Sequence, residues 1–165
     1  MTQPEQSGTS IPDALLDTPN GMFPASVDKK GRLKLPVVFQ KYLRGLPDQG
    51  LFATSLDTKV GSIYPASIWR LNKALMLKGG LDRQRNGVWD NSQIYGEDTS
   101  MDAEGRVLLP TILRRELGFE DRPVRVYCNR GRIEILSEAV YEERRRKAAE
   151  TAEADLAALE NAGFL

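Results

Sequence analysis

The sequence predicts an α+β protein that contains one small structural unit twice. The first indication is an internal duplication: residues Ser26–Pro36 return as Ser100–Pro110, with Ser, Asp, Gly, Arg and Pro in identical register. The second is that a strand-like alternation of polar and apolar residues stops, in each copy, at a proline that can begin a helix. The third is a C-terminal stretch rich in Ala, Glu and Arg, which favour helix.

The first copy begins with a predicted hairpin and a short helix. Phe23–Val27 is predicted as a strand, Asp28–Gly31 as a turn and Arg32–Leu35 as a half-buried strand. Pro36 ends the second strand because proline has no amide proton, and its fixed φ suits the first turn of a helix. We expect this helix to continue to about Arg44.

The remainder of the first copy is predicted as a second hairpin followed by a helix. Leu51–Leu56 and Ser62–Tyr64 are predicted as its two strands, joined by a turn at Asp57–Gly61. Ser67 is predicted as the N-cap of the helix. The apolar residues of the helix have helical spacing, and Trp69 on this helix is expected to lie in the core. These apolar residues are Ile68, Leu71, Leu75 and Met76.

The second copy repeats this plan. Arg106–Leu109 is predicted as a strand, and Pro110 opens a helix. Val124–Cys128 and Arg132–Leu136 are predicted to pair through a turn between them. Ser137 is expected to cap a final helix, which we extend to near Ala162.

The copies are joined by a segment with Gly79, Gly80 and several amides, which predict a loop. Trp89 in this segment is expected to cover apolar surface. Neither copy has enough strand to fold alone, so we predict one domain with an internal duplication. Its segments are a disordered tail (1–20), the first repeat (21–77), the connecting segment (78–93), the second repeat (94–141) and a C-terminal helical extension (142–165).

The residue types argue against several function classes. The 165 residues include one cysteine, Cys128, and no histidine, so Ser-His-Asp and Cys-His catalytic arrangements and most transition-metal sites lack their side chains. Cys128 is expected to be a small core residue. We expect no enzyme activity, no metal, no cofactor and no small-molecule substrate. The chain lacks a long apolar segment and a targeting signal, so we expect a cytoplasmic protein without a membrane partner.

The charges are unevenly distributed although the formal net charge is +0. The acidic residues are concentrated at the two ends, and the middle of the chain is basic. This distribution suits a polyanionic partner such as nucleic acid. Over residues 28–44, where Asp28 is the only acid, the cations are Lys29, Lys30, Arg32, Lys34, Lys41 and Arg44. Over residues 70–85, where Asp82 is the only acid, they are Arg70, Lys73, Lys78, Arg83 and Arg85.

The repeated motif combines a turn with an arginine. In each copy the aspartate can accept a hydrogen bond from the amide two residues later, and the glycine occupies a position that requires positive φ. The arginine follows at once and leaves the turn at the mouth of the hairpin, while the apolar residues after it point inward. The motif residues are Asp28, Gly31 and Arg32 in the first copy and Asp102, Gly105 and Arg106 in the second.

The doubled Asp-x-x-Gly-Arg-x-x-x-Pro motif resembles the MraZ family of transcriptional regulators over about Met22–Tyr141. The resemblance implies a duplicated swapped-hairpin β-barrel of the AbrB and SpoVT type with short helices, assembled into a ring-like homo-oligomer. It implies a nucleoid-associated regulator that binds double-stranded DNA at direct repeats in the promoter of the division and cell wall gene cluster, including its own gene. Matched by position, Arg32 and Arg106 contact DNA, and Lys29, Lys30 and Lys34 face phosphates.

The sequence departs from perfect duplication in two places. Ala103 and Glu104 replace the two lysines of the first copy, so we expect the first copy to dominate DNA binding. The C-terminal extension lies beyond the resemblance, and it has two possible roles. It is either a solvated helix with internal ion pairs or a subunit contact through Leu156, Leu159 and Phe164.

Two other functions fit parts of the sequence. Asp28 and Asp102 in a twofold body could form a carboxylate dyad, as in aspartic proteases. The adjacent arginines favour ionisation of both carboxyls, however, and the Ser or Thr of that protease motif is missing. The alternative that remains is an AbrB-like antitoxin that binds a toxin partner. Two motifs in one chain and a helical end argue against it.

Overall fold

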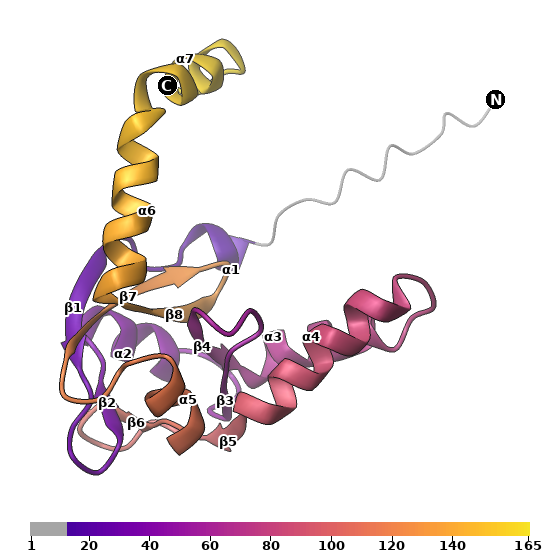
Figure 1. The fold of residues 1–165 in the computed structure, drawn as a ribbon, viewed down its shortest axis with the longest axis vertical. Coiled ribbons are helices and arrows are strands. Elements are labelled where there is room, and N and C mark those ends of the chain that lie inside the picture. The colour runs from indigo at the N-terminus through magenta and orange to yellow at the C-terminus, as the bar shows by residue number, and fades with distance from the viewer. Residues whose placement is uncertain (1–12) are drawn as a thin grey trace.

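A computed structural model of the chain describes residues 13–165, and the α+β class is confirmed. The strands are β1 Met22–Ser26, β2 Arg32–Lys34, β3 Leu51–Thr54, β4 Gly61–Pro65, β5 Glu97–Thr99, β6 Arg106–Leu108, β7 Pro123–Asn129 and β8 Arg132–Ser137. The helices are α1 Asp13–Leu16, α2 Val37–Arg44, α3 Ala66–Met76, α4 Asp82–Tyr95, α5 Thr111–Glu116, α6 Glu138–Glu150 and α7 Ala152–Asn161. Figure 1 shows α6 rising from the sheets and the α3–α4 pair extending from another side.

The strands of the two repeats are interleaved. The large sheet is antiparallel with the order β1-β7-β8-β4-β3-β5, and β2 pairs with β6 in a separate two-stranded sheet. The β7–β8 hairpin of the second repeat therefore lies between β1 and β4 of the first, and the β3–β4 hairpin of the first lies between β8 and β5 of the second. This exchange agrees with the expected swapped-hairpin fold. Within residues 13–165 the large sheet is open at β1 and β5 and does not close into a barrel.

One hydrophobic core joins the repeats. Leu33 of β2 faces Val107 of β6, and both side chains are fully buried. The same core contains Phe39 from α2 and Leu113 from α5. Each helix follows its motif proline and buries one face against this shared core. Each repeat therefore covers apolar residues of the other in this shared core.

The connecting segment is not the predicted loop, because most of it forms α4. Its inner residues Val88, Ser92 and Tyr95 have helical spacing, and a long-range hydrogen bond holds the helix against the sheet: Thr54 Oγ1 donates to the Ser92 carbonyl at 2.8 Å. A buried serine breaks the apolar pattern that marks most amphipathic helices. Tertiary contacts therefore stabilise a helix that its own sequence signals weakly.

The helices differ from the sequence prediction in three ways: an additional helix α1, an earlier start of α3 and a break in the final helix. The predicted tail contains helix α1, while residues 1–12 lie outside the described residues. The predicted Ser67 cap is wrong, because α3 begins earlier, directly after Pro65. The Ser137 cap is confirmed: its hydroxyl accepts a hydrogen bond from the Val140 amide at 3.3 Å. The final helix, however, breaks at Thr151, which separates α6 from α7.

Three residues singled out in the sequence have clear places in the fold. Trp69 is buried between Phe52 and Tyr64, with ring centroids 4.6 and 5.1 Å away, as predicted for a core residue. Cys128 is half-buried against the main core, and this burial raises the pKa of its thiol. Trp89 lies on α4, partly exposed. Over the part of the chain that is described, no helix is long and apolar enough to cross a membrane.

Candidate nucleic-acid interface

Two loops of the same conformation precede β2 and β6: the first loop, residues 28–31, and the second loop, residues 102–105. In the first, the Gly31 amide donates to the Asp28 carbonyl and the Lys30 amide donates to Asp28 Oδ1, both at 3.0 Å. The second loop repeats both bonds at the same lengths. Gly31 has φ +85° and Gly105 has φ +79°. The duplicated turn therefore has the geometry that its residue types indicate.

The two loops are linked through the ribbon formed by β2 and β6. The Leu35 amide donates to the Gly105 carbonyl at 3.0 Å, and the Leu109 amide donates to the Gly31 carbonyl at 2.9 Å. These reciprocal bonds relate the copies by a pseudo-twofold axis through the ribbon, and Figure 1 shows β2 and β6 side by side. Each loop is thus fixed by the strand of the other copy.

The ribbon sorts its side chains onto two faces. Leu33 and Val107 point into the core, so the residues on either side of them in each strand point outward. Arg106 lies directly opposite Lys34, and Arg32 lies opposite Leu108. The outward face of the ribbon therefore brings together three cations from both copies, namely Arg32, Lys34 and Arg106.

Each motif arginine is held by its own aspartate. Arg32 Nε lies 2.9 Å from Asp28 Oδ2, and Arg106 Nε lies 2.8 Å from Asp102 Oδ2. The backbone amide of each arginine also donates to the other oxygen of the same carboxylate. These contacts, led by the backbone amide, lower the pKa of both aspartates. Each guanidinium is therefore fixed along its Nε edge.

The two arginines differ in what holds their outer nitrogens. Arg106 Nη2 pairs with Glu104 Oε2 at 3.1 Å. In residues 13–165 neither Nη nitrogen of Arg32 has a hydrogen-bond partner. The side chains of Arg32 and Arg106 are equally exposed, at 28%. Lys29 and Lys30 stand exposed at the tip of the first loop, where the second has Ala103 and Glu104. The first loop thus offers more uncommitted positive charge than the second.

Two side chains that the sequence motif does not include support the loops from behind. Gln40 Nε2 donates to the Leu35 carbonyl at 2.7 Å, and the equivalent Arg114 Nε donates to the Leu109 carbonyl at 3.1 Å. Gln40 packs under Gly105 and Arg114 under Gly31, so that a Cβ at either glycine would overlap the side chain below it. Both residues stand four positions after a motif proline, which is the signal that could have identified them.

All proposed contact residues lie at this surface, although not all are equally free. Lys34 Nζ donates to the backbone carbonyl of Glu104, so its ammonium is engaged with the second loop. Arg44 Nη2 donates to the Ala103 carbonyl at 3.1 Å and also braces that loop. The surface is therefore basic, and within residues 13–165 the outer nitrogens of Arg32 and the ammonium groups of Lys29 and Lys30 have no hydrogen-bond partner.

Several curated proteins, which all have one name, are similar to this chain. It is 40% identical over 95 residues to transcriptional regulator MraZ of Acidobacterium capsulatum and 33% identical over 96 residues to that of Koribacter versatilis. Each match covers 57% of this chain and 65% of the relative, slightly less than two thirds of its length. The protein of that name from Methylobacillus flagellatus is 28% identical over 101 residues, which cover 61% of this chain and 68% of the relative. No family model matches the chain.

Proposed function

We propose that the chain is a transcriptional regulator of the MraZ family that binds double-stranded DNA sequence-specifically through the ribbon and its two loops. Its similarity to the curated regulators of that name supports the proposal. Its sites are direct repeats in the promoter of the division and cell wall gene cluster, including the promoter of its own gene. It acts as a ring-like homo-oligomer. The observation that carries the proposal is the outward face of the ribbon, where Arg32, Lys34 and Arg106 converge.

Arginine suits this role because its planar fork can donate two hydrogen bonds at once. The acceptors are O6 and N7 of guanine in the major groove, or two phosphate oxygens. Asp28 occupies the Nε edge of Arg32 and leaves the two Nη nitrogens for DNA. A guanidinium that is already oriented loses less conformational entropy on binding than a free side chain.

The shape of the site also fits B-DNA. The major groove is about 12 Å wide and admits a two-stranded β-ribbon. The ribbon of β2 and β6 is short, lies at the surface and carries its cations on one face. Lys29 and Lys30 at the loop tip can then reach the phosphates beside the groove.

One copy of the site supplies limited specificity. A bidentate base contact contributes about 1–3 kcal/mol of discrimination. Ring-like assembly increases the total, because linked sites that bind successive DNA repeats raise avidity by roughly 10²–10⁴-fold. Direct repeats, as proposed for its DNA sites, would offer one such site to each copy in turn.

DNA affinity measured by fluorescence anisotropy, on the region upstream of the protein's own gene, tests the proposal. We expect Arg32→Ala to weaken binding by about 5–150-fold, the equivalent of about 1–3 kcal/mol. Arg106→Ala should weaken it less, because Glu104 already engages one of its outer nitrogens. Arg145→Ala, a change of equal charge on exposed α6, is the matched control and should bind normally.

The same assay over a salt series separates base contacts from phosphate contacts. Lys29→Gln and Lys30→Gln should each reduce the slope of log affinity against log salt by about 0.9, because each removes one phosphate contact. Normal affinity and salt dependence for the Arg32→Ala, Arg106→Ala and lysine variants would overturn the proposal. Unchanged melting temperatures exclude misfolding as the cause of any loss.

A further inference from the structure

The C-terminal helices are held away from the rest of the molecule. The base of α6 is fixed to β7, since Arg125 Nε pairs with Glu138 at 3.2 Å and its guanidinium lies 4.5 Å from the centre of the Tyr141 ring. Arg144 on the next turn donates to the Tyr127 hydroxyl at 2.8 Å. Figure 1 shows α7 folded across the far end of α6, well separated from the α3–α4 pair.

Helix α7 has an exposed apolar face. Leu156 and Leu159 lie on one side of the helix and are 47% and 54% exposed. After the helix, the Phe164 amide donates to the Leu159 carbonyl at 2.9 Å and the Gly163 amide to the Glu160 carbonyl at 3.1 Å. This Schellman motif turns Phe164, itself 57% exposed, back toward the end of the helix.

The same helix carries negative charge only. Glu153, Asp155 and Glu160 lie within α7, and no lysine or arginine does. Helix α6, in contrast, balances its charges through internal pairs such as Lys147 Nζ to Glu143 Oε1 at 3.1 Å. Helix α7 is therefore an acidic amphipathic element, and its apolar residues have no cover in the described chain.

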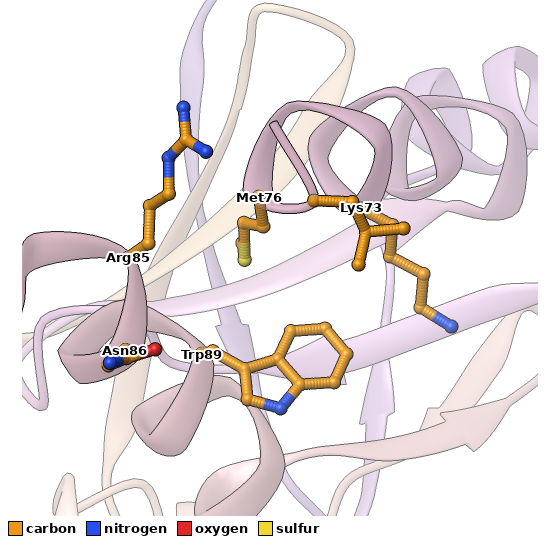
Figure 2. Close-up of a pocket in the computed structure, with 6 residues that line it drawn as sticks. Lys73, Met76, Arg85, Asn86 and Trp89 are labelled. Atoms are coloured by element: carbon orange, nitrogen blue, oxygen red, sulfur yellow. The ribbon is translucent and has the colours of Figure 1, made fainter. Parts of the chain in front are cut away.

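A groove of complementary character lies between α3 and α4. It has a volume of about 370 Å³, and its apolar lining includes Leu75, Met76, Leu81 and Val88. A second hollow of about 270 Å³ adjoins it and shares Met76 and Arg85. Figure 2 shows Met76 and Trp89 facing each other across this hollow. We refer to both hollows together as the α3–α4 groove.

The α3–α4 groove has a basic rim. Lys73, Arg85 and Arg132 line it, and between residues 70 and 85 the only acid is Asp82. Arg85 Nη1 is buried and has no hydrogen-bond partner within residues 13–165. A buried guanidinium nitrogen without an acceptor leaves its positive charge uncompensated, which favours an acidic partner at this rim.

We propose that α7 of one copy docks in the α3–α4 groove of a second copy. Leu156, Leu159 and Phe164 then enter the apolar lining, and the acids of α7 meet the basic rim. The fixed base of α6 keeps α7 from the groove of its own chain, so the contact is between copies. Such a head-to-tail contact joins two different surfaces and can close into a ring. The inference rests on the self-association in the proposed function and names the surfaces that produce it.

Sedimentation velocity of the full chain over a concentration series tests this contact. We expect Leu156→Asp/Leu159→Asp to raise the dissociation constant of self-association by about tenfold or more, because it places charge in the apolar lining. Leu75→Asp should do the same from the groove side, as it changes an exposed lining residue. Ala154→Asp lies on the opposite face of α7 and is the matched control.

Mixing the two defective variants gives the decisive result. The Leu75→Asp chain keeps an intact α7, and the Leu156→Asp/Leu159→Asp chain keeps an intact groove, so an equimolar mixture should form a heterodimer that neither variant forms alone. Assembly of both variants like the wild type would overturn the inference while leaving self-association intact. A mixture that stays monomeric, or a wild type that is monomeric at every concentration, would also overturn it. DNA binding of the wild type is measured separately by fluorescence anisotropy, so that a failure of the proposed DNA binding can be distinguished from a failure of this contact.

Discussion

Gly31 and Gly105 show how strongly the candidate site depends on single residues. Both have positive φ, and both lie directly over a side chain of the opposite repeat. A β-carbon at Gly31 would therefore meet two separate costs, the left-handed backbone and overlap with the Arg114 guanidinium. Gly118 also has positive φ, +74°, but a β-carbon there would meet no atom within 4 Å. A comparison of Gly31 with Gly118 therefore separates the cost of the left-handed backbone from the cost of the overlap.

We expect Gly31→Ala to lower the free energy of unfolding by more than Gly118→Ala, for which backbone strain alone gives about 1–2 kcal/mol. Urea unfolding measures both. In an Arg114→Ala background, the cost of Gly31→Ala should fall toward that of Gly118→Ala. Equal costs for the two glycines in the wild-type background would show that Arg114 yields freely and does not support the first loop.

Asp28 and Asp102 link the loops to pH. Hydrogen bonds, first of all from the backbone amides of Arg32 and Arg106, lower the pKa of both carboxyls in the folded protein. A lowered pKa in the folded state stabilises the fold above the usual aspartate value of about 4, and the stabilisation is lost as the pH falls through the folded value. We therefore expect the loops to keep their geometry down to below about pH 4.

Carbon-detected NMR titration of the two carboxyls tests this expectation. Asp28 and Asp102 should titrate below the usual aspartate pKa of about 4. Asp28→Asn/Asp102→Asn should show less loss of stability between neutral and acid pH than the wild type. Titration of Asp28 and Asp102 at or above the usual aspartate pKa would contradict the ion-paired geometry of the loops.

Helix α4 contains a glycine that allows a direct test of the structure of the connecting segment. Gly87 lies inside α4 with a negative φ, and a β-carbon there would meet nothing within 4 Å. Gly80, in the turn before α4, has the same open space but φ +95°. Alanine restricts the unfolded chain at both positions, so only the backbone conformation distinguishes them.

We expect Gly87→Ala to raise the free energy of unfolding by about 0.5–1 kcal/mol, because alanine favours helix over glycine. Gly80→Ala should lower it by about 1–2 kcal/mol through its left-handed backbone. Thermal and urea unfolding of the two variants give the comparison. If Gly87→Ala proves neutral or destabilising, residues 82–95 do not form a stable helix in solution.

Local patterns in the sequence account for most of the elements. The strand, turn and proline-started helix of each repeat were predictable because Arg32–Leu35 and Arg106–Leu109 combine alternation with a turn and a proline. Helix α4 was not, because its packing depends on a buried serine and a hydrogen bond from Thr54, distant in sequence. The break at Thr151 carries no glycine or proline signal.

In the candidate site, the sequence predicts the surface arginines but not the side chains that support the loops beneath them. The duplicated turn identifies Arg32 and Arg106 from sequence, since local geometry alone places them. Gln40 and Arg114 support the loop of the opposite repeat, so their role depends on how the repeats interleave. The ion pair between Arg106 and Glu104 likewise required the folded loop to become visible.

A chain with a formal net charge of +0 can still present a basic surface. The interleaved strands bring the cations of both repeats to one ribbon, while helix α7 carries its acids to the far end of α6 (Figure 1). This separation gives the molecule two oppositely charged regions. One suits DNA and the other suits the basic α3–α4 groove of a second copy.

Hydroxyl-radical footprinting on the DNA upstream of the protein's own gene tests the central proposal most directly. We expect the wild type to give evenly spaced protection over direct repeats. The Arg32→Ala/Arg106→Ala variant should lose this protection at the same protein concentration while keeping its melting temperature. Protection that persists in the variant, or no protection by the wild type at low salt, would show that the ribbon and its two loops do not bind this DNA.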